Sequence, residues 1–180
     1  MKLRQRNRAS VAVLLSVLGF TIPTGLIAQV VSPDSLVLIA REIIEAANYV
    51  GLITLDADGH PQARVMDPFP PEPNMTVWLA TNPRSRKVEQ IEADNRVTLY
   101  YFDPAGLSTV TLMGTARLVD DSAEKAQRWK PGWEVFYPDR GSSYLLIEIR
   151  PIRMEVVSVK YGLMGDPATW TPPGMDIHVN

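Results

Sequence analysis

The segment STVTLMGTARLV (residues 108–119) decides the expected fold, because it is a long run of strand-forming residues with a glycine in its middle. Valine and threonine favour extended backbone. A glycine inside a strand often marks a sharp bend or a bulge. The segment therefore predicts a long strand bent at Gly114, which favours a small closed antiparallel barrel. A plain β-sandwich is the alternative architecture.

Shorter strand patterns lie on both sides of this segment. YVGLITLD (49–56) and PQARVM (61–66) are joined by a turn sequence and predict a hairpin. Further strands are expected at 75–81, 96–102, 143–149 and 153–159, and helices at 33–48, 85–93 and 121–129. Ser32 and Pro33 are residue types preferred at a helix start. The sequence predicts one mainly β domain over 33–161 and a tail rich in proline and glycine at 162–180.

The composition is that of a folded protein with one core. The chain has 180 residues, of which 46% are hydrophobic and 21% charged, and it has no cysteine. Disulfides, thiolate nucleophiles and cysteine-ligated metals are therefore excluded. A net charge of −2 argues against a nucleic-acid-binding protein, which normally has a basic face.

The first 28 residues have the pattern of a secretory signal peptide. Four basic residues between positions 2 and 8 precede an uncharged stretch at 9–33, and Ala28 lies where a cleavage site is expected. We therefore expect an exported protein. The alternative is an uncleaved membrane anchor, because the uncharged stretch is long enough to span a bilayer. Cleavage would remove four basic residues and no acidic one, changing the net charge from −2 to −6.

Motifs for metal binding and for covalent catalysis are absent from the sequence. His60 and His178 are the two histidines, and neither belongs to a spacing typical of metal ligands, so we expect no metal site. There is no Gly-x-Ser-x-Gly elbow and no glycine-rich phosphate loop.

The segment TNPRSRK (81–87) has the residue types of a phosphate-binding site. Arg84, Arg86 and Lys87 lie beside the hydroxyls of Thr81 and Ser85, between a predicted strand and a predicted helix that begins at Ser85. Backbone N–H groups and the helix dipole attract anions at such a helix start. The alternative interpretation is a solvated charged turn.

Arg64 is the second candidate for phosphate binding. It lies in the otherwise apolar segment ARVM (63–66) of the predicted hairpin. An arginine that points inward requires an anion, and phosphate accepts hydrogen bonds from both arms of the guanidinium. An arginine that points outward from an alternating strand is the alternative.

Taken in order, these segments resemble the pyridoxamine 5′-phosphate oxidase-like flavin-binding split barrels, and the general stress protein branch most closely. The shared order is a hairpin with Arg-x-Met, an apolar strand, Thr-Asn-x-x-Ser-x-Lys, a short helix and an Asp-Asn-x-Val strand. VTLMGTARLVDD (110–121), WKP (129–131) and YLLIEIRP (144–151) extend the similarity, which covers residues 36–161.

The resemblance implies a six-stranded antiparallel split β-barrel, usually a homodimer, with FMN in each of two clefts at the subunit interface. Carried over by position, the residues expected to hold the FMN phosphate are Arg64, Ser85, Arg86 and Lys87. Val65 and Met66 would line the isoalloxazine ring, with Thr81 alongside. Thr109 stands where the oxidase has a glutamine that reaches FMN from the other subunit. Trp129 and Trp133 are candidates to cover the ring or to form plain core.

Two departures argue against vitamin B6 oxidation. Asp67 stands where the oxidase has a basic residue near the flavin, and residues 171–180 lack the arginine- and histidine-bearing segment that grips pyridoxal phosphate. Three hypotheses follow. The first is an FMN-dependent oxidoreductase of unknown substrate. The second is a split barrel that binds a deazaflavin, haem or another tetrapyrrole. The third is a non-enzymatic binding protein.

Overall fold

The computed structural model describes residues 31–177. The predicted signal peptide or membrane anchor at 1–28 lies outside these residues. No helix within 31–177 is both long and apolar enough to cross a membrane.

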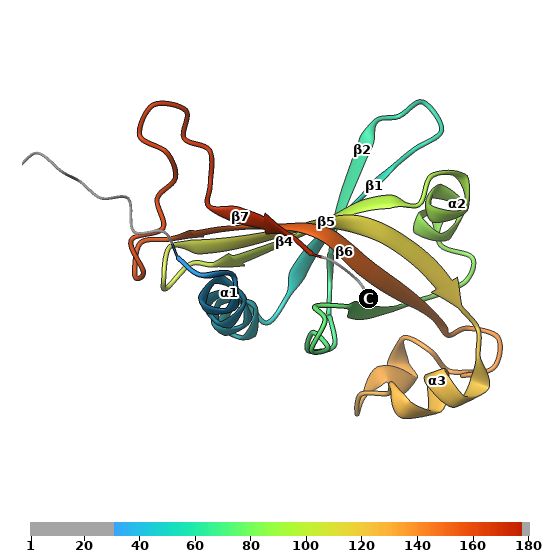
Figure 1. Ribbon diagram of the computed structural model, residues 1–180. Helices are drawn as coiled ribbons and strands as arrows, with labels where there is room; N and C mark the ends of the chain where they lie inside the picture. Colours follow the sequence, from blue (N-terminus) through green and yellow to red (C-terminus); the bar gives the residue numbers. More distant parts are fainter. Residues whose placement is uncertain (1–30, 178–180) are drawn as a thin grey trace, which may run out of the picture. The chain divides into compact units, whose positions relative to one another are not determined.

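The predicted mainly β fold is confirmed (Figure 1). The strands are β1 (Val50–Leu55), β2 (Pro61–Met66), β3 (Val77–Thr81), β4 (Arg96–Asp103), β5 (Ser108–Val119), β6 (Leu145–Ser158) and β7 (Gly174–Asp176). They form one antiparallel sheet in the order β2-β1-β4-β5-β6-β3, and β7 also pairs with β6. Helices α1 (Pro33–Ala47), α2 (Arg86–Ala93) and α3 (Ser122–Gln127) and the 3-10 helix η1 (Trp133–Val135) complete the described chain.

The closed barrel expected from the strand pattern alone is wrong. The split barrel implied by the resemblance is confirmed, because the sheet is open between β2 and β3. These two strands stand at opposite ends of the sheet order and are not paired within residues 31–177. The segment that joins them, residues 67–74, contains four prolines and is here called the proline loop. Proline has no backbone N–H to donate to a strand ladder. The chain therefore crosses this gap without extending the sheet.

The predicted bend at Gly114 is confirmed. It also explains why the strands expected at 143–149 and 153–159 form one strand, β6. β6 runs without interruption through Pro151, and the β5–β6 register shifts between Met113 and Gly114, opposite that proline. A Cβ atom on Gly114 would lie 2.2 Å from the Arg150 carbonyl oxygen and 2.7 Å from the Pro151 Cα. The two backbones meet so closely here that the position requires glycine.

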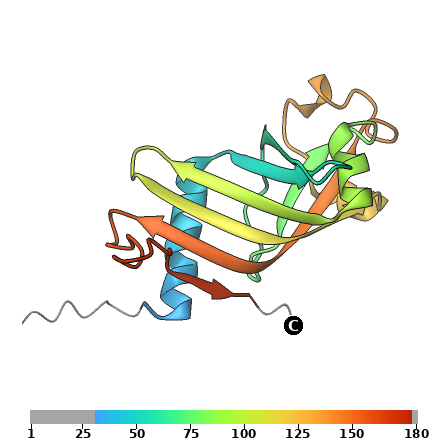
Figure 2. The ribbon, with the colours of Figure 1, turned by 90° about the horizontal axis from the view of Figure 1, so that it is seen from above.

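Helix α1 covers the inner face of the sheet. The Ser32 side chain accepts a hydrogen bond from the Ser35 N–H, and Pro33 is in the first turn, as predicted. The apolar side of the helix is buried through Leu36, Ala40, Ile43 and Ile44. Figure 2 shows the helix crossing the strands on one side of the sheet. This packing forms the main core.

The tail is more ordered than predicted. Its residues Gly174–Asp176 form β7, which pairs with Arg153–Glu155 of β6. β3 pairs only with the first half of β6, at Leu145–Ile149. The second half of β6 would otherwise present an open edge, and covering such an edge satisfies its backbone groups. No strand signal marks this segment, because the sequence there is short and rich in proline.

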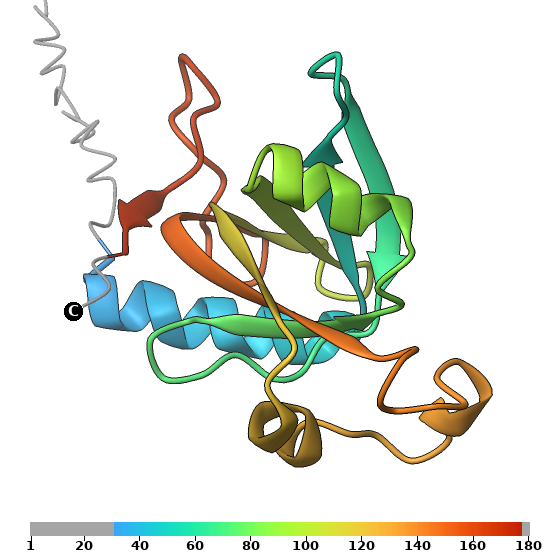
Figure 3. The same cartoon turned by 90° about the vertical axis from the view of Figure 1, so that its right-hand side faces the viewer.

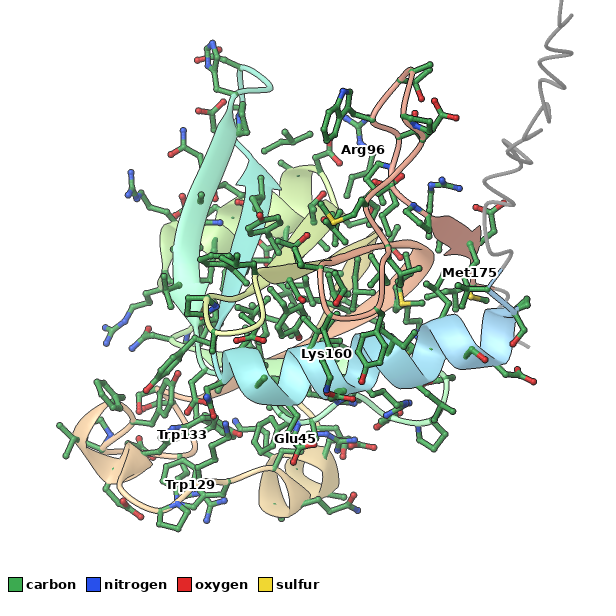
Figure 4. The ribbon with its side chains drawn as sticks, turned by 90° about the vertical axis from the view of Figure 1, so that its left-hand side faces the viewer. Glu45, Arg96, Trp129, Trp133, Lys160 and Met175 are labelled. Carbon is green, nitrogen blue, oxygen red and sulfur yellow. The ribbon has the colours of Figure 1, made fainter. Side chains whose placement is uncertain are left out.

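A second, smaller core lies around α3 and η1. Trp78, Trp133 and Tyr144 are buried in it, and Trp129 packs edge-on against both Trp133 and Tyr144. Figure 4 shows Trp129 and Trp133 together on the segment that follows α3. Helix α3 is shorter than predicted and ends at Gln127.

Candidate functional site

A cavity of about 510 Å³ lies where the ends of β2 and β3 meet the start of α2. We call it the β2–β3 cavity. Five of the eight predicted site residues line it: Val65, Met66, Thr81, Ser85 and Lys87. The strands that supply them are the two ends of the open sheet. The cavity thus lies at the split in the barrel, and Figure 3 shows α2 beside the β1–β2 hairpin there.

Three polar side chains form a connected network in this cavity. The Lys87 Nζ donates a hydrogen bond to the Thr81 Oγ1 at 3.0 Å, and the Thr81 Oγ1 lies 2.9 Å from the Ser85 Oγ. Thr81 is buried at the end of β3, and Lys87 is half-buried in the first turn of α2. The ammonium has three N–H donors, so it retains donors for a ligand.

Ser85 occupies the N-cap of α2, as predicted, but its side chain does not cap the helix. A serine at this position usually accepts a hydrogen bond from a backbone N–H two or three residues later. Here its hydroxyl is turned to Thr81. The first-turn N–H groups of an α-helix have no partner within the helix. In α2 the Val88 N–H donates to the Ser85 carbonyl oxygen at 2.9 Å, so the N–H groups of Arg86 and Lys87 are the ones left for an anion at the helix start.

Arg64 points inward, which is one of the two orientations that the sequence left open. It lies opposite Leu52, which is fully buried, on the same face of the sheet. Its Nη1 donates to the Thr54 Oγ1 at 2.6 Å, and its Nη2 donates to the Gln90 Oε1 at 2.8 Å. These contacts hold a half-buried guanidinium beside α2. Thr54 and Gln90 carry no signal in the sequence, because ordinary polar residues gain this role only through the fold.

The basic residues near the cavity are not neutralised by carboxylates. The ion pairs among residues 31–177 include none with Arg64, Arg84, Arg86 or Lys87. Burial lowers the pKa of Lys87, and the charge of Arg64 lowers it further. Burial likewise lowers the pKa of Arg64, with an added contribution from Arg86. Partly desolvated positive charges that repel one another would be stabilised by a bound dianion such as phosphate.

The opposite side of the cavity is apolar and aromatic. Trp133, Phe136 and Tyr137 line it together with Val65 and Met66. Trp133 was a candidate from the sequence, whereas Phe136 and Tyr137 were missed. They follow Trp133 closely in WEVFY (133–137), and this density of aromatic residues is the signal that marks them. A site with cations at one end and flat apolar side chains at the other suits a phosphorylated ring compound.

Three predicted residues do not line the cavity. Arg64 and Arg86 lie beside it and act on it through charge. Thr109 lies at the start of β5. The other end of β5 pairs with the first residues of β6, which also pair with the end of β3 at Thr81. Thr109 does not line the cavity of its own chain.

Asp67 is paired with a basic residue from a distant segment. The Lys130 Nζ donates a hydrogen bond to the Asp67 carboxylate and another to the Pro68 carbonyl oxygen at 2.7 Å. Asp67 also lines the β2–β3 cavity. The acidic residue that departs from the oxidase pattern is thus accompanied by a cation.

The Asp56, Asp58 and His60 side chains come together at the tip of the β1–β2 hairpin. The Asp56 Oδ1 accepts hydrogen bonds from the N–H groups of Asp58 and His60, and its Oδ2 accepts from Gln62. These bonds lower the pKa of Asp56, with the bond from His60 contributing most. The carboxylate is used to close the turn, in line with the turn predicted there.

The comparisons with known proteins agree with this geometry. Residues 39–158 match the family model described as pyridoxamine 5′-phosphate oxidase. Among curated proteins, none matches the chain.

Solved structures with the same fold include a Clostridium acetobutylicum protein related to general stress protein 26 of Bacillus subtilis. It has a TM-score of 0.67 and 21% identity, over 81% of this chain and 97% of that one. A pyridoxamine 5′-phosphate oxidase-related, FMN-binding protein of Nostoc punctiforme has a TM-score of 0.55 and 16% identity, over 83% and 99%. A haem-binding protein of Mycobacterium smegmatis has a TM-score of 0.57 and 22% identity, over 71% and 55%.

The family model covers most of the chain, including both strands and the helix that form the β2–β3 cavity. The open antiparallel sheet agrees with the split barrels of these solved structures. The chain therefore belongs to the pyridoxamine 5′-phosphate oxidase-like family of split-barrel proteins.

Proposed function

We propose that this protein binds FMN in the β2–β3 cavity and is a flavin-dependent oxidoreductase. The observation that carries the proposal is the half-buried Lys87, which contacts the Thr81 hydroxyl and has no carboxylate partner among residues 31–177. Arg64 and Arg86 add positive charge beside it. A phosphate group would neutralise this charge, and the cavity volume suits a small cofactor.

Each lining residue has a role in this proposal. The Lys87 ammonium and the backbone N–H groups of Arg86 and Lys87 hold the phosphate, and the hydroxyls of Thr81 and Ser85 contribute hydrogen bonds. Val65 and Met66 contact the ring from β2. Trp133 and Tyr137 exclude water from its other side. When bound, FMN supplies hydride and electron transfer, so the protein's part is binding, orientation and the local electric field.

FMN fits these residues better than haem does. Haem iron is commonly held by an axial histidine, and the cavity is lined by Met66 and Tyr137, which are also ligand types, but by no histidine of the described chain. His60 lies on the β1–β2 turn with its side chain 73% exposed, and it does not line the cavity. The cluster of cations, in contrast, has a direct use for a phosphate. Oxidation of pyridoxamine phosphate is not part of the proposal, because residues 171–177 have neither arginine nor histidine.

The outer face of the sheet favours a homodimer. The register places Val65, Gly51, Tyr100 and Thr111 in one row across β2, β1, β4 and β5. Val65 is 74% exposed and Tyr100 is 44% exposed. Exposed apolar side chains that share one face of a sheet are typical of a protein interface. We propose that a second copy of the chain covers this face, which also carries Thr109 beside Phe102.

Placing a charge in this row is expected to separate the dimer. Tyr100→Glu should weaken dimerisation by about 30-fold or more, because a carboxylate would lose hydration at the centre of an apolar contact. Sedimentation velocity over a range of concentrations measures the change. Leu38→Glu, at a residue of α1 that is 68% exposed, is the matched control and should leave the dimer intact. A wild-type chain that is monomeric at high concentration would contradict the proposal.

The test of cofactor binding compares FMN with riboflavin, which lacks the phosphate. The full chain should bind FMN at least about 100-fold more tightly than riboflavin, since charge-assisted hydrogen bonds contribute about 1.5–3 kcal/mol each. Isothermal titration calorimetry gives both affinities, and the flavin absorption bands should co-elute with the protein in gel filtration. Equal affinity for the two flavins would contradict the phosphate site. Failure to bind either would favour another cofactor or a non-enzymatic binding role.

A further inference from the structure

A second cavity adjoins the β2–β3 cavity. It is lined by the C-terminal half of α1, by the proline loop and by Lys130, and we call it the α1 cavity. Its volume is about 740 Å³, which is in the range of small-molecule sites. Tyr49 and Asp67 line both cavities. A compound bound in the α1 cavity would therefore lie next to a ligand of the β2–β3 cavity.

The walls of the α1 cavity are largely apolar and are held in place. Ile44 of α1 is 5% exposed, and Phe69 and three prolines face it from the proline loop. Arg41 fixes that loop to the helix, because its Nη1 donates to the Pro71 carbonyl oxygen at 3.0 Å and its Nη2 donates to the Glu72 carbonyl oxygen. The Phe69 N–H also donates to the Trp78 carbonyl oxygen at 2.9 Å. A site formed in advance binds a ligand without a cost of ordering.

The charges on the lining are balanced. Arg41 and Lys130 are matched by Glu45 and Asp67, and Lys130 forms an ion pair with Asp67. Glu45 is exposed on α1 and is labelled in Figure 4. Arg41 donates one N–H from each terminal nitrogen to a carbonyl oxygen of the proline loop. The balance favours an uncharged ligand, in contrast to the basic β2–β3 cavity.

Two residues that line the α1 cavity retain hydrogen-bond donors. The Lys130 Nζ makes bonds to Asp67 and Pro68, which leaves one of its three N–H groups. It lies 5.2 Å from the centre of the Phe69 ring and 5.5 Å from that of Trp133. The Asn48 Nδ2 donates to the Ala46 carbonyl oxygen and retains a second N–H. A ligand with acceptor oxygens would satisfy these donors.

We propose that the α1 cavity binds an uncharged, planar ring compound with carbonyl oxygens, of which a quinone is the simplest example. The apolar walls enclose the rings, and Lys130 donates to a carbonyl oxygen. That this compound would lie beside a flavin rests on the proposed function. Its binding in the α1 cavity does not depend on flavin binding.

The experiment uses the full chain without flavin and two probes, 2-methyl-1,4-naphthoquinone and the anionic 1,4-naphthoquinone-2-sulfonate. Isothermal titration calorimetry should show that the uncharged quinone binds about tenfold more tightly or better. Lys130→Met should weaken its binding by about tenfold, because a charge-assisted donor is lost. Glu45→Lys should bring the two probes closer in affinity, since it makes the lining positive. Glu92→Lys, at an exposed residue of α2 outside this cavity, is the matched control and should change neither affinity.

The outcomes separate this inference from the proposed function. Quinone binding that needs Lys130 but persists in the presence of saturating FMN supports the α1 cavity. The inference is overturned if FMN displaces the quinone, if neither Lys130→Met nor Glu45→Lys changes quinone binding, or if the quinone does not bind at all. If the quinone binds as expected and FMN does not bind, the proposed function fails and the α1 site stands.

Discussion

Replacing Gly114 with alanine is expected to destabilise the protein by about 3 kcal/mol or more. The added Cβ would lie 2.2 Å from the Arg150 carbonyl oxygen and 2.7 Å from the Pro151 Cα, both backbone atoms of β6. A flexible side chain can move away from a new methyl group, but a paired strand cannot move without breaking its ladder. The loss would be a large part of the total stability of a typical domain. The midpoint of urea unfolding measures it.

Gly51→Ala is the matched control for this substitution. Gly51 also lies inside a strand, β1, yet a Cβ there would meet the Tyr100 carbonyl oxygen at 3.4 Å, which is ordinary van der Waals contact. This variant should lose about 1 kcal/mol or less. Both variants should be compared at one protein concentration, because Gly51 lies in the proposed dimer face. Similar losses for the two variants would show that the bulge does not require glycine.

The parts of the fold that could be predicted from the sequence are those with a local cause. The helix at 33–47 follows from Ser32, Pro33 and its apolar spacing, and the bend at Gly114 follows from a glycine inside a strand. The opening of the sheet was implied by the family resemblance but by no local pattern, and strand β7 was not predicted at all. Both depend on which strand edges remain unpaired after folding, and no short segment of sequence carries that information.

The candidate site shows the same division. The sequence pointed to Lys87, Ser85 and Thr81 because a basic, hydroxyl-rich segment at a helix start has a local physical meaning, and these residues line one cavity. Thr54 and Gln90, which hold Arg64, could not be found in this way. They lie 36 residues apart and are brought together only because α2 packs against β1. Lys130, 63 residues from Asp67, was missed for the same reason.

Replacing Lys87 with methionine is expected to change FMN affinity and ligand-free stability in different directions. FMN binding should weaken by about 10- to 100-fold, since a charge-assisted bond of about 1.5–3 kcal/mol is lost. The ligand-free protein should be as stable as the wild type or more so. Its charged Lys87 is half-buried and repelled by Arg64, and the apolar methionine carries neither penalty. A substitution that weakens ligand binding but does not lower stability is typical of a residue that serves binding.

The pH dependence follows from the same lowered pKa of Lys87. Between that lowered pKa and the ordinary value of 10.5, the unfolded chain binds more protons at this residue than the folded chain. As the pH rises through this range, the contribution of Lys87 to the stability of the folded protein therefore increases. Over the same range Lys87 loses its charge in the folded protein, which weakens phosphate binding. Raised tyrosine pKa values act in the opposite direction only above about pH 10, where unfolded tyrosine ionises. The difference between the wild type and Lys87→Met from pH 7 to 10 isolates the contribution of Lys87.

Arg84→Met provides the control, because Arg84 is an exposed cation in the same loop that does not line the β2–β3 cavity. It should weaken FMN binding by only a few-fold through long-range charge, with no gain in stability. Calorimetric FMN titrations and urea midpoints, measured on the wild type and both variants across this pH range, give the comparison. The fall in FMN affinity with pH should be present in the wild type and Arg84→Met and absent from Lys87→Met. If Lys87→Met retains wild-type affinity with the same pH profile, the phosphate is bound elsewhere, because no other cation of the described chain donates to the Thr81 hydroxyl.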